Sequence, residues 1–389
     1  MSLHRPLLMA IVETKMLDKF NWIYLIFGAS LLLIVGLSPS THDYALYLEQ
    51  WEHIAQGHDP WQNTLNAYGP FYTSFAYIAE IHPKLPALVF MSVYLLAFWL
   101  LCNPSPRFSV CLFGLINPLF LIFGLLYNNN ETLLAGLLIL ALWALEKQKD
   151  GFSGMLFALA CAFKFSAGFL FPLFFIRKGK INFKNLLAFS LTIGLLYLWA
   201  FLRWGDSFLI PFQFGMARDS RLLSVFRFIR GTHQPLAFLG MHTLDQFANM
   251  LMLLVYLALL LFIVLKKIRH TALSACIIML GIFSFYKVGN HQYFITTFAL
   301  FALFVQQRGW QKLSKPLKII SISALCWFGF TAILYHFTRA EGWGYGGLHF
   351  PIREWIGGPT FLSEMLWLFF LMKEALGNVN ARPNTDFTL

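Results

Sequence analysis

An aspartate near the start of the chain has the residue type and setting of a catalytic base. Asp43 stands in Ser-Thr-His-Asp-Tyr, shortly after the first long apolar segment at 20–37. A carboxylate at this place can take the proton of an attacking hydroxyl group. Aspartate is also a preferred N-cap, and a helix is expected over 44–57. The spacing alone favours the cap, and one residue can serve both roles.

Four arginines in a short segment are candidates for binding a phosphate group. They are Arg218, Arg221, Arg227 and Arg230, with Asp219 as the one acid among them. A phosphate leaving group needs cations, because negative charge develops on it as its bond breaks. The planar guanidinium group matches phosphate oxygens in pairs. The alternative is a basic interfacial helix that contacts anionic lipid headgroups.

Other ionisable residues interrupt the apolar pattern. Lys164 lies in a strongly apolar run, so we expect it either to face a polar cavity or to extend its ammonium to the interface. Lys287 and His291 flank a short turn and could bind a phosphate or a sugar, with a solvated histidine as the alternative. Glu131 follows three asparagines and could hold sugar hydroxyls or a cation, or favour a helix N-terminus. The residues alone leave these alternatives open.

The elements that must position these residues are transmembrane helices. Of 389 residues, 58% are hydrophobic and 12% charged, and the mean hydropathy is +0.63. A soluble domain carries about 25% charged residues, so the composition excludes an ordinary soluble enzyme, a disordered chain and a coiled coil. We predict an all-α polytopic membrane protein with about 12 transmembrane helices, since each span needs about 17 residues or more. The predicted spans are 20–37, 86–102, 109–127, 132–146, 152–164, 167–176, 185–204, 244–265, 271–286, 291–306, 319–337 and 361–376.

The basic residues predict the orientation of these spans. Arg5, Lys15 and Lys19 precede the first span, which places the N-terminus in the cytoplasm. The same rule accounts for most of the net charge of +11, so we expect no nucleic-acid partner. Lys164, the arginines of 218–230 and Lys287 fall on the outer side against the rule. This exception directs the search for function to the outer face.

The first of three long external segments is expected to be structured. These segments are 38–85, 205–243 and 338–360. Apolar spacing predicts two amphipathic helices in the outer interface, over 44–57 and 70–82. Pro60, Gly69 and Pro70 punctuate the turn between them. We expect a single transmembrane domain over 1–376 and a polar C-terminal tail over 377–389.

Several short motifs follow one another in a recognisable order. They are Asp43-x-x-x-Tyr, Gly57-x-x-Pro-Trp, Tyr68-Gly-Pro, Asn128 to Glu131, Lys164 followed by Pro172, and Asn290-His-Gln-Tyr. Over roughly 15–310 this order resembles the GT-C glycosyltransferases. It is most similar to the polyprenyl-phosphate-mannose-dependent type, glycosyltransferase family 87, and to GPI mannosyltransferase I. Family members often have Tyr-x-Tyr-Pro-Pro where this chain has Ala-Tyr-Gly-Pro, which leaves the sugar and the linkage open.

The resemblance implies an inverting single displacement outside the cytoplasm, with a polyprenyl-phosphate hexose, mannose first, as the donor. The acceptor would be a hydroxyl of a glycolipid or glycan, and Asp43 would be the base. The residues implied for substrate binding are Tyr68, Glu131, Lys164, Arg218, Arg221, Arg227, Lys287 and His291. No cofactor and no metal site are expected, and a divalent-metal requirement stays open. The expected location is a bacterial inner membrane, with the site facing outward.

Three other classes compete with this interpretation. An O-antigen ligase or polymerase would use a diphosphate-linked donor, but such proteins usually carry one very large external loop late in the chain. Here the largest external loop, 38–85, comes first. A lipid-linked sugar transporter or flippase predicts an internal repeat, and no repeat is visible. The external arginines argue weakly against a non-catalytic scaffold.

Overall fold

The computed structural model is almost entirely helical, and this confirms the all-α prediction. It describes residues 22–40, 43–62, 66–102, 107–177, 180–217, 221–222, 241–268, 270–286, 288–338 and 350–380. Within these ranges the strands form only two-residue pairs. β1 (Ile176–Arg177) pairs antiparallel with β2 (Lys180–Ile181), and β3 (Arg221–Leu222) pairs parallel with β4 (Val288–Gly289).

The predicted spans correspond to helices with similar bounds. In chain order these are Trp22–Leu37, α5 (Leu85–Cys102), α6 (Phe108–Gly114), the π-helical η1 (Phe120–Leu126), α7 (Glu131–Glu146), α8 (Asp150–Phe163), η2 (Phe165–Leu170), α9 (Phe171–Phe175), α10 (Phe183–Trp204), α14 (Met241–Leu265), α15 (Thr271–Phe285), α16 (Phe294–Arg308), α17 (Lys315–Thr338) and α18 (Phe350–Asn380). Four helices among the described residues are long and apolar enough to cross a membrane, and a bent pair makes a fifth candidate. The count of about 12 spans, which rests on the length that each crossing needs, stays a prediction.

Two predicted segments are interrupted or extended. The span expected over 109–127 is broken into α6 and η1, because Pro118 lacks the amide donor of a continuous helix. The Asn117 Oδ1 atom accepts the Phe120 amide at 2.8 Å and caps the second piece. α18 continues to Asn380 and so includes the first residues of the predicted tail.

A sharp bend separates η1 from α7. The two helix axes meet at 107°. The linking residues are Tyr127 to Asn130, and Asn128 adopts a φ of +52°. Asparagine tolerates this left-handed conformation better than other non-glycine residues. The three asparagines therefore form the turn that places Glu131 at the start of α7.

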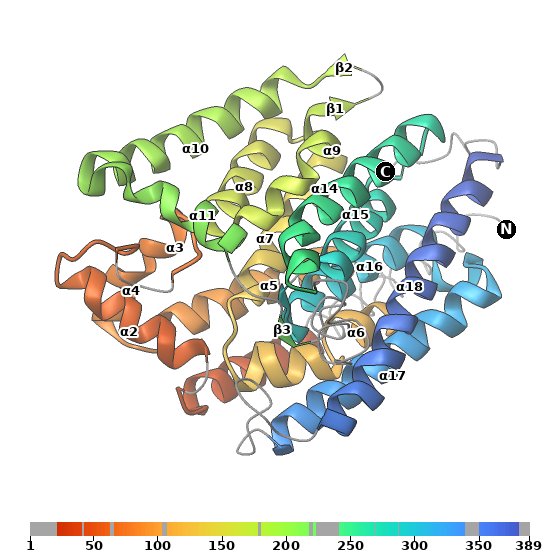
Figure 1. Cartoon of the computed structure of the whole chain (residues 1–389), viewed down its shortest axis with the longest axis horizontal. Coiled ribbons are helices and arrows are strands. Elements are labelled where there is room, and N and C mark those ends of the chain that lie inside the picture. Colours follow the sequence, from red (N-terminus) through yellow and green to blue (C-terminus); the bar gives the residue numbers. More distant parts are fainter. Residues whose placement is uncertain are drawn as a thin grey trace, which may run out of the picture.

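The first external segment forms the predicted helices, with one break. α2 (Asp43–Ala55) buries Tyr44, Tyr47, Trp51 and Ile54 on one face. The second helix is divided at Ser74 into α3 (Pro70–Thr73) and α4 (Phe75–Ile81). These helices lie together at one side of the bundle, opposite α17 and α18 (Figure 1). Their position in a membrane interface stays a prediction.

The middle of the bundle is α7. Almost every residue of this helix is buried, and α5, α8 and α16 pack around it (Figure 1). α10 and α14 instead leave most of their apolar side chains uncovered by protein. This division is the one expected of a helix bundle whose outer helices face lipid. The start of α7, where Glu131 lies, is thus at the centre of the molecule.

Gly69 allows the loop before α3 to contact the end of α8. The Gly69 amide donates to the Phe163 carbonyl at 3.2 Å. A Cβ atom at Gly69 would lie 2.3 Å from the Ala162 carbonyl oxygen, which is main-chain and has little freedom to move. The glycine therefore fixes Tyr68, its neighbour, beside the segment that carries Lys164.

We predict that Gly69→Ala destabilises the protein, by about 1–3 kcal/mol as is typical of overpacking. The measurement is the midpoint of thermal unfolding of the purified protein in detergent. Gly151→Ala is the matched control, because the space around its Cβ position is open. This change in α8 should leave the midpoint unchanged or raise it slightly through helix propensity. Equal midpoints for both variants would contradict the close contact.

Candidate functional site

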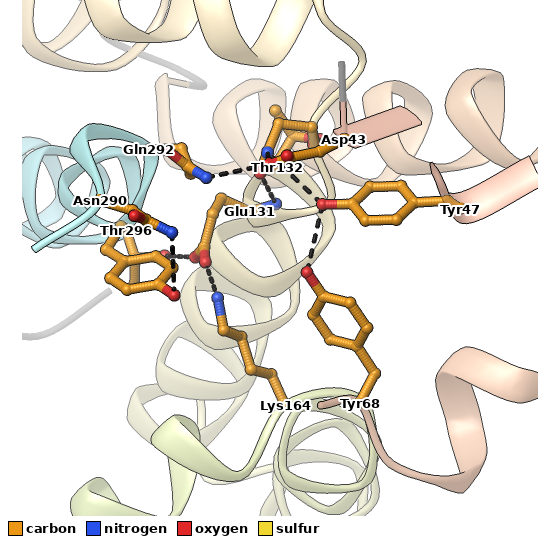
Figure 2. Close-up of polar contacts among 11 residues, drawn as sticks. Asp43, Tyr47, Tyr68, Glu131, Thr132, Lys164, Asn290, Gln292 and Thr296 are labelled. Atoms are coloured by element: carbon orange, nitrogen blue, oxygen red, sulfur yellow. Dashed lines mark hydrogen bonds and ion pairs between the residues drawn. The ribbon is translucent and has the colours of Figure 1, made fainter. Parts of the chain in front are cut away.

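Polar side chains from several separate segments meet near the start of α7 (Figure 2). They come from the first residue of α2, the bend before α7, the end of α8 and the turn before α16. Apolar helices surround them on most sides. A polar cluster of this kind within an apolar bundle is a functional-site candidate by default.

Asp43 is the partly exposed carboxylate of the cluster. It is the first residue of α2, where the helix dipole favours a negative charge. Its Oδ2 atom accepts hydrogen bonds from Asn129 Nδ2 at 3.1 Å and from Gln292 Nε2 at 3.0 Å. Asn129 is held in turn, because its Oδ1 atom accepts the Glu131 amide at 3.0 Å. Asp43 thus begins a helix and also contacts side chains from two distant segments.

Tyrosine hydroxyls lie beside the Asp43 carboxylate. The Tyr47 and Tyr68 hydroxyl oxygens are 3.2 Å apart, and Asn129 Nδ2 donates to Tyr47 at 3.5 Å. Burial raises the pKa of Tyr68 to about 12, and the negative charge of Asp43 acts in the same direction. The Lys164 ammonium opposes this shift. Both tyrosines are therefore neutral hydrogen-bonding groups at physiological pH.

Lys164 forms a buried ion pair with Glu131. Its Nζ contacts Glu131 Oε1, and Thr296 donates to the other carboxylate oxygen at 3.2 Å. The ammonium also lies 4.0 Å from the centroid of the Tyr293 ring. Glu131 is fully buried, so its carboxylate faces these partners at the helix N-terminus. The alternative of an ammonium extended to the interface does not describe Lys164 here.

His291 is buried, in contrast to the solvated turn histidine that the sequence left open. It is fully enclosed, and its ring stacks on Phe123 with centroids 5.6 Å apart and lies 5.5 Å from the Tyr335 ring. Burial lowers the pKa of His291 to about 3, so the imidazole is neutral at physiological pH. Its role in binding phosphate or sugar stays a prediction.

The remaining basic candidates are described only in part. Arg218, Arg227 and Lys287 lie outside the described residues. The backbone of Arg221 pairs with Val288 in the parallel β3–β4 contact. This contact brings the arginine-rich segment beside the turn that precedes α16. Among the described residues, no three His, Cys, Asp or Glu side chains form a metal-ligand cluster.

Sequence reasoning missed several residues that complete the cluster. Asn129, Gln292 and Thr296 contact the carboxylates directly. The first two stood inside motifs that the sequence singled out, Asn128 to Glu131 and Asn290 to Tyr293. The signal was a run of amide side chains at the end of an apolar segment. The sequence directed attention to His291, but its neighbour Gln292 contacts Asp43.

We predict that breaking the ion pair costs more than removing both partners. Glu131→Gln leaves the Lys164 ammonium buried without its carboxylate, and loss of one partner of a buried pair typically costs about 3–5 kcal/mol. Lys164→Met leaves Glu131 in the same position. The double variant should recover part of the loss, measured as the free energy of unfolding in a double-mutant cycle. Additive losses would show that the two side chains do not interact.

Comparisons with known proteins agree with this architecture. The family model for the EpsG family matches residues 21–216. The crystal structure of ArnT from Cupriavidus metallidurans bound to undecaprenyl phosphate is similar in fold, with a TM-score of 0.50 at 12% sequence identity. The similarity covers 92% of this chain and 78% of that chain. No curated protein matches the chain in sequence.

The structural similarity shows a polytopic membrane protein of the GT-C type, in line with the resemblance seen in the motifs. The finer resemblance to family 87 and to GPI mannosyltransferase I stays a prediction. The family model extends over half of the chain and includes Asp43, the bend before α7 and Lys164. The chain therefore belongs to the EpsG family.

Proposed function

We propose that this protein is a membrane-embedded inverting glycosyltransferase. It transfers a hexose, with mannose as the first candidate, from a polyprenyl-phosphate donor to a hydroxyl of a glycolipid or glycan. Asp43 is the general base. The site faces the non-cytoplasmic side of a bacterial inner membrane, and the reaction needs no cofactor.

The observation that carries this proposal is the setting of Asp43. Two amide donors orient its carboxylate, and the side chain keeps part of its surface exposed. A base must be both oriented and accessible to the hydroxyl whose proton it takes. The nearby tyrosine hydroxyls stay neutral and are suited to hydrogen-bonding a sugar. Asp43 therefore has the geometry of a base rather than that of a helix cap alone.

The reaction proceeds in one displacement. The acceptor oxygen attacks the anomeric carbon while its proton passes to the Asp43 carboxylate. The bond between that carbon and the phosphate oxygen breaks, and its electron pair stays on the lipid phosphate. Attack opposite the leaving group inverts the anomeric configuration. The protein supplies an oriented base at one end of this path and must supply cations at the other.

The cations proposed for the phosphate are Lys164, Arg218, Arg221, Arg227 and Lys287, with His291 as a neutral neighbour. Lys164 is the described member of this group, and its ammonium lies 6.0 Å from the Tyr68 ring centroid, on the same side of the cluster as Asp43 (Figure 2). The β3–β4 pairing supports placing the arginine segment beside the same site. ArnT, the structurally similar protein, was solved with undecaprenyl phosphate, and this supports a polyprenyl-phosphate partner.

We predict that Asp43→Asn lowers turnover by about 10²-fold or more, because the amide accepts no proton. The assay follows release of radiolabelled mannose from undecaprenyl-phosphate-mannose by the purified protein, with a crude glycolipid extract as the acceptor. Glu52→Gln is the matched control, since Glu52 is an exposed acid on the same helix. This variant should keep wild-type turnover.

Equal turnover of wild type and Asp43→Asn would remove Asp43 from the reaction. If the wild type turns over no phosphate-linked donor but cleaves a diphosphate-linked one, the ligase or polymerase alternative replaces this proposal. Movement of intact donor across vesicles without cleavage would indicate a flippase instead.

A further inference from the structure

We propose that Gln292 is a positioning residue for the base: its side-chain amide holds the Asp43 carboxylate in the orientation that the acceptor hydroxyl requires. This inference rests on the proposed role of Asp43. It assigns a function to a residue in the second half of the chain, beyond the part that the family model matches.

The contact itself is well defined. Gln292 Nε2 donates to Asp43 Oδ2 at 3.0 Å, and the two residues are 249 positions apart in sequence. An ionised carboxylate only accepts hydrogen bonds, so the nitrogen of the glutamine amide must face it rather than the oxygen. Asn129 donates to the same oxygen from the other side of the site (Figure 2). Two donors from separate segments fix the direction of a side chain that would otherwise rotate freely.

Gln292 is itself held in a rigid frame. It lies in the 3₁₀ turn η4 (His291–Tyr293), between β4 and the fully buried first turns of α16. Within this turn the Tyr293 amide donates to the Asn290 carbonyl at 3.2 Å. β4 pairs with β3, so the backbone before Gln292 is also anchored. The glutamine has 9% of its surface exposed, which leaves its side chain little room for other orientations.

Gln292 is a cleaner position to test than Asn129. Asn129 also accepts the Glu131 amide and, through its carbonyl, the Thr132 hydroxyl at 2.9 Å. A substitution at Asn129 would therefore disturb the bend before α7 as well as the carboxylate. At Gln292 the amide can be replaced by groups of similar size without removing a helix cap.

Other charged and titratable groups face Asp43 from neighbouring elements. Tyr47 lies on α2, Tyr68 on the preceding loop and Tyr72 on α3, and the charge of Asp43 raises the pKa of all three. These neutral hydroxyls carry no charge to offset a lost donor. The Lys164–Glu131 pair lies farther along the cluster, with no net charge as a unit. His291, beside Gln292, is neutral.

The test measures the pH at which Asp43 takes up a proton, in full-length protein in detergent. Infrared difference spectra against Asp43→Asn identify its carboxyl band, and the pH dependence of mannose release from undecaprenyl-phosphate-mannose gives a second readout. Gln292→Met removes the donor, which favours the protonated acid, so the midpoint should rise by about 1–2 pH units. Because activity needs the ionised base, the acid limb of the activity profile should move up equally. Gln292→Glu places a like charge nearby and should shift both further.

Thr297→Val is the matched control. Thr297 lies on the same helix, is fully buried, and its hydroxyl has no hydrogen-bond partner among the described residues. This variant should leave the Asp43 midpoint and the activity profile as in the wild type. An unshifted midpoint in both Gln292→Met and Gln292→Glu would overturn the proposal. A shifted midpoint in a protein that cleaves no tested donor would uphold the contact and refute the proposed function instead.

Discussion

The free-energy cost of placing charge inside an apolar helix bundle is the constraint on which this structure depends. An unpaired ammonium or carboxylate in such surroundings costs several kcal/mol, so Lys164 and Glu131 occur together and each restricts the other. Their pairing requires the end of α8 to lie against the start of α7. Thr296 satisfies the second carboxylate oxygen and so ties α16 to the same point. Three of the most buried helices thus meet where the charges meet, and the polar site is built around that junction.

Two turns carry both halves of the site. The bend before α7 supplies Asn129 to the Asp43 carboxylate and Glu131 to Lys164. The turn before α16 repeats this arrangement one helical turn apart, with Gln292 on Asp43 and Thr296 on Glu131. The proposed base and the proposed phosphate-binding cation are therefore mounted on the same two pieces of backbone. A displacement of either turn would move both groups together, which keeps constant the separation that a single displacement needs.

The fold was predictable where hydropathy is the deciding force. Apolar runs predicted most helices with bounds close to those observed, and apolar spacing predicted α2, whose buried face includes Trp51 and Ile54. The prediction was wrong where local backbone chemistry interrupts an apolar run. Pro118 breaks the expected span 109–127, and Ser74 divides the expected helix 70–82. Hydropathy counts these residues as small changes in an average, whereas the backbone responds to a missing amide donor or a local change of direction.

The sequence by itself determined the class of the protein and the chemical types available to it. Its composition requires a helical membrane protein, and the placement of Asp43, Glu131 and Lys164 among apolar segments marks them as candidates. Only the tertiary structure decided which of them touch. Gln292 and Asp43 meet across 249 positions, and His291, its immediate neighbour, points into an aromatic contact instead. Helical periodicity specifies the face on which a residue lies, but the order in which helices pack around α7 depends on contacts between distant segments. That order brings the carboxylate, the amides and the ammonium into one site.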